Sequence, residues 1–225
     1  MGVYAYCVVP AQQQPPAGLV GIDNVAVELL RVDDLGVWMS AGAKPQASVE
    51  AVQAHNRVVE VAVTKEVTPV PLRFGQWLED TIKLGDAVRE RGNEYASLLE
   101  HFAGCLEFGL RLVDPDETGE AQEVHSQPST GTEYMQALRD STKLAERKQA
   151  EIEAIGASVR ELLGDIIRDE RVESAQTRHA VLTLSHLVAR EHFDEYRARA
   201  RRIRTMFPAL RLLLTGPWPP YSFAV

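Results

Sequence analysis

The stretch CLEFGLRLV, residues 105–113, decides how the second half of the chain folds. Leu106, Phe108, Leu110 and Leu112 alternate with polar or small residues, and this two-residue period is typical of a strand with one buried face. The patterns that follow predict a helix, two strands, a helix and a final strand, over 133–168, 171–176, 180–189, 191–206 and 209–215. The resulting order, βαββαβ, is the plan of a ferredoxin-like antiparallel sheet with helices on one face.

The first helix of this plan is longer than the plan requires. Apolar residues recur in it every seven positions, which is the spacing of a helical seam. They are Leu138, Ala145, Ile152, Val159 and Ile166. Its first half is polar enough to project from the body of the domain, so we expect a helical extension there.

The first 75 residues show the patterns of a separate α+β unit. Runs of β-branched and aromatic residues predict three or four strands, with candidates over 3–9, 25–32, 35–40 and 66–70. Residues 47–65 carry apolar residues near helical spacing, with Ser48 as a candidate N-cap. Apolar stripes predict two more helices over 76–103, with a break at Gly92.

The predicted fold class is therefore α+β with two domains. The N-terminal mixed α+β domain spans residues 1–75, and the C-terminal ferredoxin-like βαββαβ domain spans 76–225. The helical extension of the second domain covers about 76–103 and 132–168. Residues 114–131, rich in Pro, Gly, Ser, Thr and acids, are expected to form a mobile loop.

Composition and charge narrow the class of function. The formal net charge of −8 argues against a protein that coats nucleic acid, because phosphate binding needs a concentrated basic surface. No apolar run approaches the roughly 20 residues needed to span a bilayer. The N-terminus lacks the basic start and the long apolar run of a signal peptide. We expect a cytoplasmic protein with neither nucleic acid nor a lipid membrane as partner.

Motifs for catalysis, cofactors and metals are missing from the sequence. It contains no GxGxxG, P-loop, GxSxG or HExxH pattern. His186, Glu191 and His192 lie close together along the chain, but their spacing favours solvated or capping residues over metal ligands. We expect no enzyme, no cofactor and no metal. The alternative is a ferredoxin-like protein that binds a small ligand or runs catalysis, because fold does not dictate function.

Five arginines are concentrated between residues 197 and 204. They fall on the flanks of a helix whose apolar stripe runs from 193 to 207, and such arginines most often form a solvated face. No aromatic residues accompany them for base stacking, so an acidic protein partner is favoured over nucleic acid.

The first candidate motif is TPVPLRFG, residues 68–75. Its prolines favour an extended approach and Gly75 permits an unusual backbone angle. Arg73 then lies in a rigid turn beside Phe74, where its guanidinium could pair with a carboxylate. The pairing could be with a partner or an internal ion pair at a corner between domains.

The second candidate motif is LLTGPWPPYSF, residues 213–223. A strand leads into a proline-stiffened tail with three aromatic residues. The tail either packs on its own domain or presents the aromatics to a partner, since Trp and Tyr on a rigid backbone are good anchors. The candidate interface residues are Gly216, Pro217, Trp218, Pro219, Pro220, Tyr221 and Phe223, with Arg73, Phe74 and Gly75 from the first motif.

Together the two motifs resemble the gas vesicle F/L protein family (GvpL/GvpF), whose members also open with a pattern like Tyr4-Ala5-Tyr6. The resemblance spans essentially the whole chain. It implies an accessory or minor protein of gas vesicle formation, associated with vesicles, that binds the hydrophobic major shell protein and other accessory proteins. The physical need is clear, because exposed apolar surfaces of a shell protein aggregate unless they are covered before assembly. The resemblance leaves open whether the chain is F-like or L-like, a chaperone or a wall component.

Overall fold

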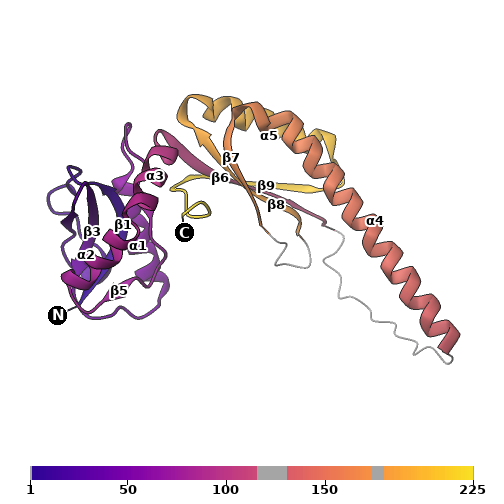
Figure 1. The fold of residues 1–225 in the computed structure, drawn as a ribbon. Coiled ribbons are helices and arrows are strands. Elements are labelled where there is room, and N and C mark those ends of the chain that lie inside the picture. The colour runs from indigo at the N-terminus through magenta and orange to yellow at the C-terminus, as the bar shows by residue number, and fades with distance from the viewer. Residues whose placement is uncertain (1, 116–130, 174–179, 225) are drawn as a thin grey trace. The chain divides into compact units, whose positions relative to one another are not determined.

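The computed structural model describes residues 2–115, 131–173 and 180–224 of the chain (Figure 1). It is a mixed α+β structure with two antiparallel sheets. Its contacts divide it into two compact units. Unit 1 is Met1–Phe108 with Leu187–Arg190 and Gly216–Val225, and unit 2 is Gly109–His186 with Glu191–Thr215. The predicted boundary at residue 75 concerns independently folding domains and stays a prediction.

The sheet of unit 1 is built around the strand β1, Val3–Pro10. The strand order is β2-β3-β1-β4, and β5 also pairs with β1. All of these pairings are antiparallel, with Val8 opposite Val37 on β3 and Val70 on β4. The other strands are β2 Glu28–Val32, β3 Leu35–Ala41, β4 Val70–Pro71 and β5 Trp77–Leu78.

Both faces of β1 are covered, which explains why its sequence is almost continuously apolar. Tyr4 and Tyr6 on one face pack in a core with residues of the helix α1, Val49–Ala62. Val3 and Ala5 on the other face pack in a second core with residues of α2, Thr81–Glu90, and α3, Gly92–Phe102.

The helix starts in unit 1 follow local capping chemistry. Ser48 caps α1 as predicted, because its hydroxyl accepts a hydrogen bond from the Ala51 amide at 3.1 Å. The prediction of a helix beginning at residue 76 was wrong. Gly75 turns the chain at a φ of +102°, the β5 residues pair with β1, and Asp80 caps α2 by accepting from the Lys83 amide at 2.8 Å.

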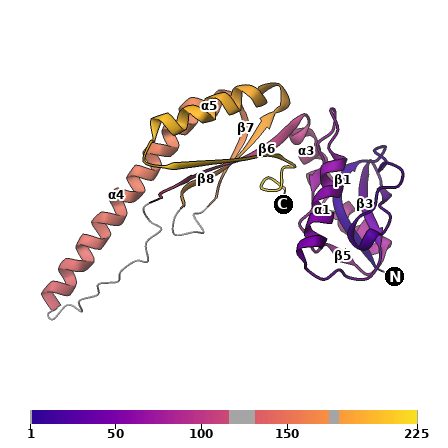
Figure 2. The ribbon, with the colours of Figure 1, turned by 180° about the vertical axis from the view of Figure 1, so that it is seen from behind.

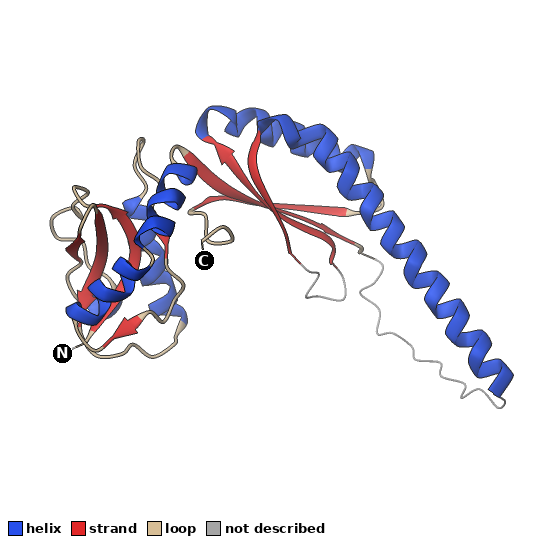
Figure 3. Cartoon of the chain, viewed as in Figure 1, coloured by secondary structure: helices blue, strands red, loops and turns tan. Residues whose placement is uncertain are grey.

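The second sheet has the strand order β7-β8-β6-β9. Its strands are β6 Cys105–Val113, β7 Ile167–Glu173, β8 Ala180–Ala189 and β9 Arg211–Trp218. The helices α4, Gly131–Leu163, and α5, Phe193–Met206, lie together over one face of this sheet (Figures 2 and 3). Strands β6, β8 and β9 each contribute residues to both units.

The helix α4 changes character along its length. Ile155, Val159 and Leu163 in its second half are buried, whereas Met135 and Leu138 in its first half are each 49% exposed. The predicted end at residue 168 was too late: a 3-10 turn, Gly164–Ile166, follows α4 and β7 begins at Ile167. Most of the expected loop 114–131 lies outside the described residues. Within the described part of the chain, no helix is long and apolar enough to cross a membrane.

Candidate partner-binding surface

The first motif forms a turn that is attached to the core from inside. The Gly75 amide donates a hydrogen bond to the Tyr4 hydroxyl at 3.0 Å. The Phe74 ring lies 5.9 Å from the rings of both Tyr4 and His55, so it is half-buried in an aromatic cluster. Arg73 is exposed and makes no ion pair with any residue that the structure describes. The turn therefore holds a half-buried ring next to a guanidinium in solvent.

His55 of α1 is the centre of this cluster and is only 1% exposed. Its Nε2 lies 2.9 Å from the Leu72 carbonyl, which can only accept, so Nε2 carries the proton. Nδ1 then accepts from the Tyr4 hydroxyl at 2.9 Å. Burial lowers the pKa of His55 to about 4, against the opposing effect of the bond to Leu72, and burial raises the pKa of Tyr4 to about 12. Both side chains are neutral at physiological pH.

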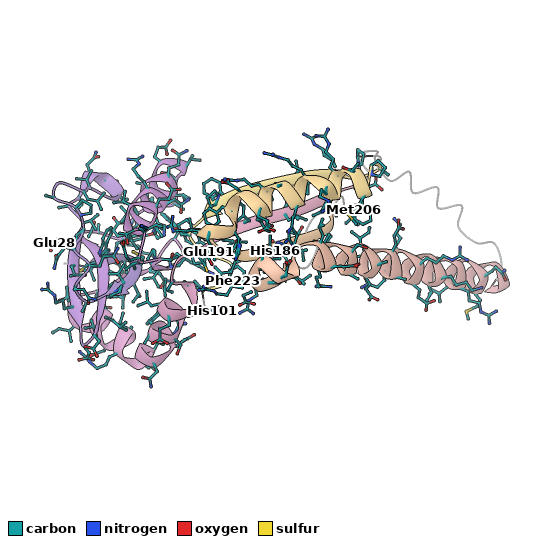
Figure 4. The ribbon with its side chains drawn as sticks, turned by 90° about the horizontal axis from the view of Figure 1, so that it is seen from above. Glu28, His101, His186, Glu191, Met206 and Phe223 are labelled. Atoms are coloured by element: carbon teal, nitrogen blue, oxygen red, sulfur yellow. The ribbon has the colours of Figure 1, made fainter. Side chains whose placement is uncertain are left out.

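The second motif returns to the same unit and begins with a turn that only glycine permits. Gly216 has a φ of +102°, and a Cβ there would lie 2.5 Å from the Glu107 carbonyl oxygen. Pro219 and Pro220 are buried. Phe223, which is labelled in Figure 4, is 2% exposed. It belongs to the core between α2, α3 and the face of the first sheet that carries Val3 and Ala5.

A buried carboxylate holds the tail in place. Glu107 on β6 is 8% exposed. One of its oxygens accepts from the Ser222 amide at 2.9 Å and the other from the Ser222 hydroxyl at 2.7 Å. Charge-assisted bonds of this kind are among the stronger ones in proteins. The tail from Gly216 to Phe223 is thus tied down at both ends.

Tyr221 joins the second motif to the first. Its hydroxyl donates to the Asn56 side-chain oxygen at 3.0 Å, and its ring lies 6.4 Å from the ring of His55. Phe74 and Tyr221 therefore both pack against His55, and the structure brings the two motifs together around one buried imidazole.

Trp218 is the exception within the tail, because it is 48% exposed. With Pro217 and Pro219 it lines a hollow of about 400 Å³, whose other wall includes Leu106 and Arg190. The Arg190 guanidinium donates to the Thr64 carbonyl at 3.0 Å, while its buried Nε–H has no partner among the described residues. An exposed indole and an incompletely bonded guanidinium share this hollow.

Several residues that organise the structure were not identified from the sequence. His55 and Glu107 are polar residues on otherwise buried faces. A polar residue at an apolar position of the pattern was the only sign in the sequence that they have structural roles.

The expectation that His186 is solvated or a capping residue was wrong, since it is completely buried (Figure 4). Its Nε2–H donates to Glu170 at 3.2 Å and its Nδ1 accepts from the Tyr196 hydroxyl at 2.7 Å. Among the described residues, no three His, Cys, Asp or Glu side chains gather to hold a metal.

The fold as a whole matches two solved structures. The crystal structure of the gas vesicle protein GvpF from Anabaena superposes with a TM-score of 0.79 and 19% identity, over 100% of this chain and 96% of that one. The GvpF structure from Microcystis aeruginosa gives 0.76 and 21%, over 100% and 99%. The chain thus has the fold of this class of gas vesicle proteins.

Sequence comparison reaches the same class independently. The family model described as "Gas vesicle synthesis protein GvpL/GvpF" matches residues 2–225. Gas vesicle protein L2 of Halobacterium salinarum is 27% identical over 99% of this chain and 91% of its own length. Gas vesicle protein F1 of the same organism is 24% identical over 80% and 71%. The chain belongs to the GvpL/GvpF family of gas vesicle synthesis proteins, which confirms the resemblance inferred from its two motifs.

Proposed function

We propose that this chain acts in the cytoplasm, where it binds the hydrophobic shell protein during nucleation or growth of the gas vesicle. The same proposal includes retention as a minor wall component and contact with other accessory proteins. It includes no enzymatic reaction and no binding to nucleic acid or to a lipid membrane. Membership of a family of gas vesicle synthesis proteins supports a role in vesicle formation.

The observation that carries the binding proposal is the exposure of Trp218. Its neighbours Pro219, Pro220 and Phe223 are buried, so the indole stands on backbone that is already ordered. An ordered aromatic anchor loses little conformational entropy when it binds. Aromatic residues in such positions often supply much of the affinity of an interface. In this proposal Arg73, which is exposed on the turn of the first motif, supplies a polar contact to the shell protein.

The test is a comparison of two truncations at exposed positions of unit 1. Trp218→Ala should weaken binding of the shell protein by about 2 kcal/mol, or roughly 30-fold in Kd. Ile82→Ala, at a position 72% exposed on α2, should leave binding unchanged. Both variants should keep the unfolding midpoint of the wild type, because neither side chain is buried. Equal binding by the wild type and a folded Trp218→Ala variant would show that the tail is structural only.

We also propose that the second sheet with α4 and α5 is a ferredoxin-like domain. The strand order β7-β8-β6-β9 supports this assignment, because it places the strands of a βαββαβ chain in the order second, third, first, fourth. Such a domain can present one open sheet face and two edges to a partner.

A further inference from the structure

The two edges of the second sheet are different in kind. Natural proteins protect exposed edge strands with charged residues, which discourage pairing with another chain. The edge strand β7 follows this rule, because five of its seven residues are charged. The opposite edge strand, β9, has three successive leucines, Leu212, Leu213 and Leu214, after a single arginine. β9 therefore lacks the usual protection.

Among the described residues, β9 pairs with β6 alone and leaves its other edge without a strand partner. None of the residues of β9 is buried, and Leu213 is 38% exposed. Beyond its pairing with β6, no described residue hydrogen-bonds to the backbone of residues 212–214. Every second residue of an antiparallel edge strand directs both its N–H and its C=O outward. The strand thus offers free backbone groups together with apolar side chains.

A hollow of about 600 Å³ lies at the start of β9. It is lined by Pro115, Pro208, Ala209 and residues 210–213, and Arg204 and Arg211 give it a basic rim. Neither arginine forms an ion pair with a residue in the described ranges. The hollow is therefore apolar at its prolines and leucines and positively charged at the two arginines.

We propose that β9 is a docking edge, where an extended strand of another protein pairs with it and extends the sheet. The added strand is apolar, and acidic residues lie beside its apolar run. Leu212 and Leu214 lie on one face of β9, and Leu213 lies on the other between Arg211 and Thr215, so the added strand is apolar opposite the three leucines. Pro217 has no N–H and ends the pairing. The inference rests on the proposed function in naming the shell protein as the source of this strand.

The basic rim decides between this partner and a second copy of the chain. Pairing of β9 with β9 across a twofold axis would bring the two rims, each with Arg204 and Arg211, into one interface. Like charges placed together in an interface oppose association. Acidic residues beside the added strand would instead neutralise the rim, so charge complementarity favours a different protein.

The experiment compares one substitution at the two edges. Leu213→Lys places a charge on β9, and Val172→Lys does the same on β7, where Val172 is 57% exposed. The first probe is a synthetic peptide of alternating valine and leucine flanked by aspartates, with a lysine-flanked peptide as its charge control. The second probe is the shell protein, coexpressed and copurified with each variant.

The expected result has three parts. The aspartate-flanked peptide slows amide hydrogen exchange in residues 211–216 of the wild type, and the lysine-flanked peptide binds at least tenfold more weakly. Leu213→Lys abolishes this protection and lowers copurification of the shell protein at least tenfold. Val172→Lys changes neither.

Other outcomes overturn the inference in distinguishable ways. Protection at β7 or at neither edge refutes a docking edge at β9. A wild-type dimer that Leu213→Lys dissociates identifies a second copy as the occupant. Peptide protection at β9 without any copurification of the shell protein refutes the proposed function and leaves the edge as a site for another partner. Full copurification by Leu213→Lys refutes the shell protein as the occupant of β9 and leaves the proposed function standing.

Discussion

Titration of His55 should make the stability of unit 1 depend on pH. The imidazole is neutral and buried, with Nδ1 accepting from Tyr4. Its pKa is about 4 in the folded protein, compared with about 6.5 in an unfolded chain. The folded state therefore binds fewer protons than the unfolded state between these values. Stability from this group is complete above pH 6.5 and is lost as the pH falls toward 4.

The two pKa values set the size of the effect. Linkage gives a loss of about 2 kcal/mol in the free energy of unfolding between pH 7 and pH 5, and about 3 kcal/mol below pH 4. Structurally, a proton on Nδ1 removes the acceptor of the Tyr4 hydroxyl, so the hydrogen bond that connects α1 to β1 is lost.

Urea unfolding at pH 7 and pH 5, followed by tryptophan fluorescence, measures this loss. The completely enclosed Trp38 is a reporter within unit 1. His55→Gln removes the titrating group and should reduce the loss between the two pH values by about 2 kcal/mol. His192→Gln is the matched control, because the His192 side chain is 37% exposed. The reasoning is refuted if His55→Gln and the wild type lose the same stability from pH 7 to pH 5.

Three further substitutions test individual contacts, each read out as the free energy of unfolding in urea. Gly216→Ala should cost roughly 2–4 kcal/mol, from the positive φ and the close approach of the Glu107 carbonyl; a neutral effect would contradict that geometry. Glu107→Gln should cost about 2 kcal/mol and speed hydrogen exchange at the Ser222 amide, and unchanged exchange would argue against the bond. Tyr196→Phe should cost about 1–3 kcal/mol, because His186 loses its buried donor; a cost near zero would mean that the bond contributes nothing.

The elements with a clear periodicity were predictable from the sequence. The strand at 105–113 has the predicted bounds, because alternation of leucines and phenylalanine with small or polar residues leaves little choice of structure. β7 was placed four residues too late, since a charged edge strand has no apolar alternation. β5 has only two residues and no pattern, and its pairing with β1 depends on the turn at Gly75. Such short edges are decided by tertiary contacts.

The candidate site was predictable only in part, for a related reason. The two motifs were found because unusual strings of proline and aromatic residues stand out in a sequence. The roles of single residues did not follow, since the packing of Tyr221 against His55 and the exposure of Trp218 depend on which surface the tail meets. His55 and Glu107 are paired with residues 17 and 115 positions away, respectively, and no local pattern encodes such a pairing.

The return of the tail to unit 1 has a consequence for biosynthesis. Phe223 and Ala224 belong to the same core as Val3 and Ala5 on β1. During translation, the first sheet leaves the ribosome long before the residues that seal it. Its core can be complete only after residues 216–224 have emerged, and until then part of its apolar surface stays uncovered. Folding of the first part of the protein is thereby coupled to the synthesis of residues 216–224, and a chain interrupted before Gly216 would expose that core to the proteases and chaperones of the cell.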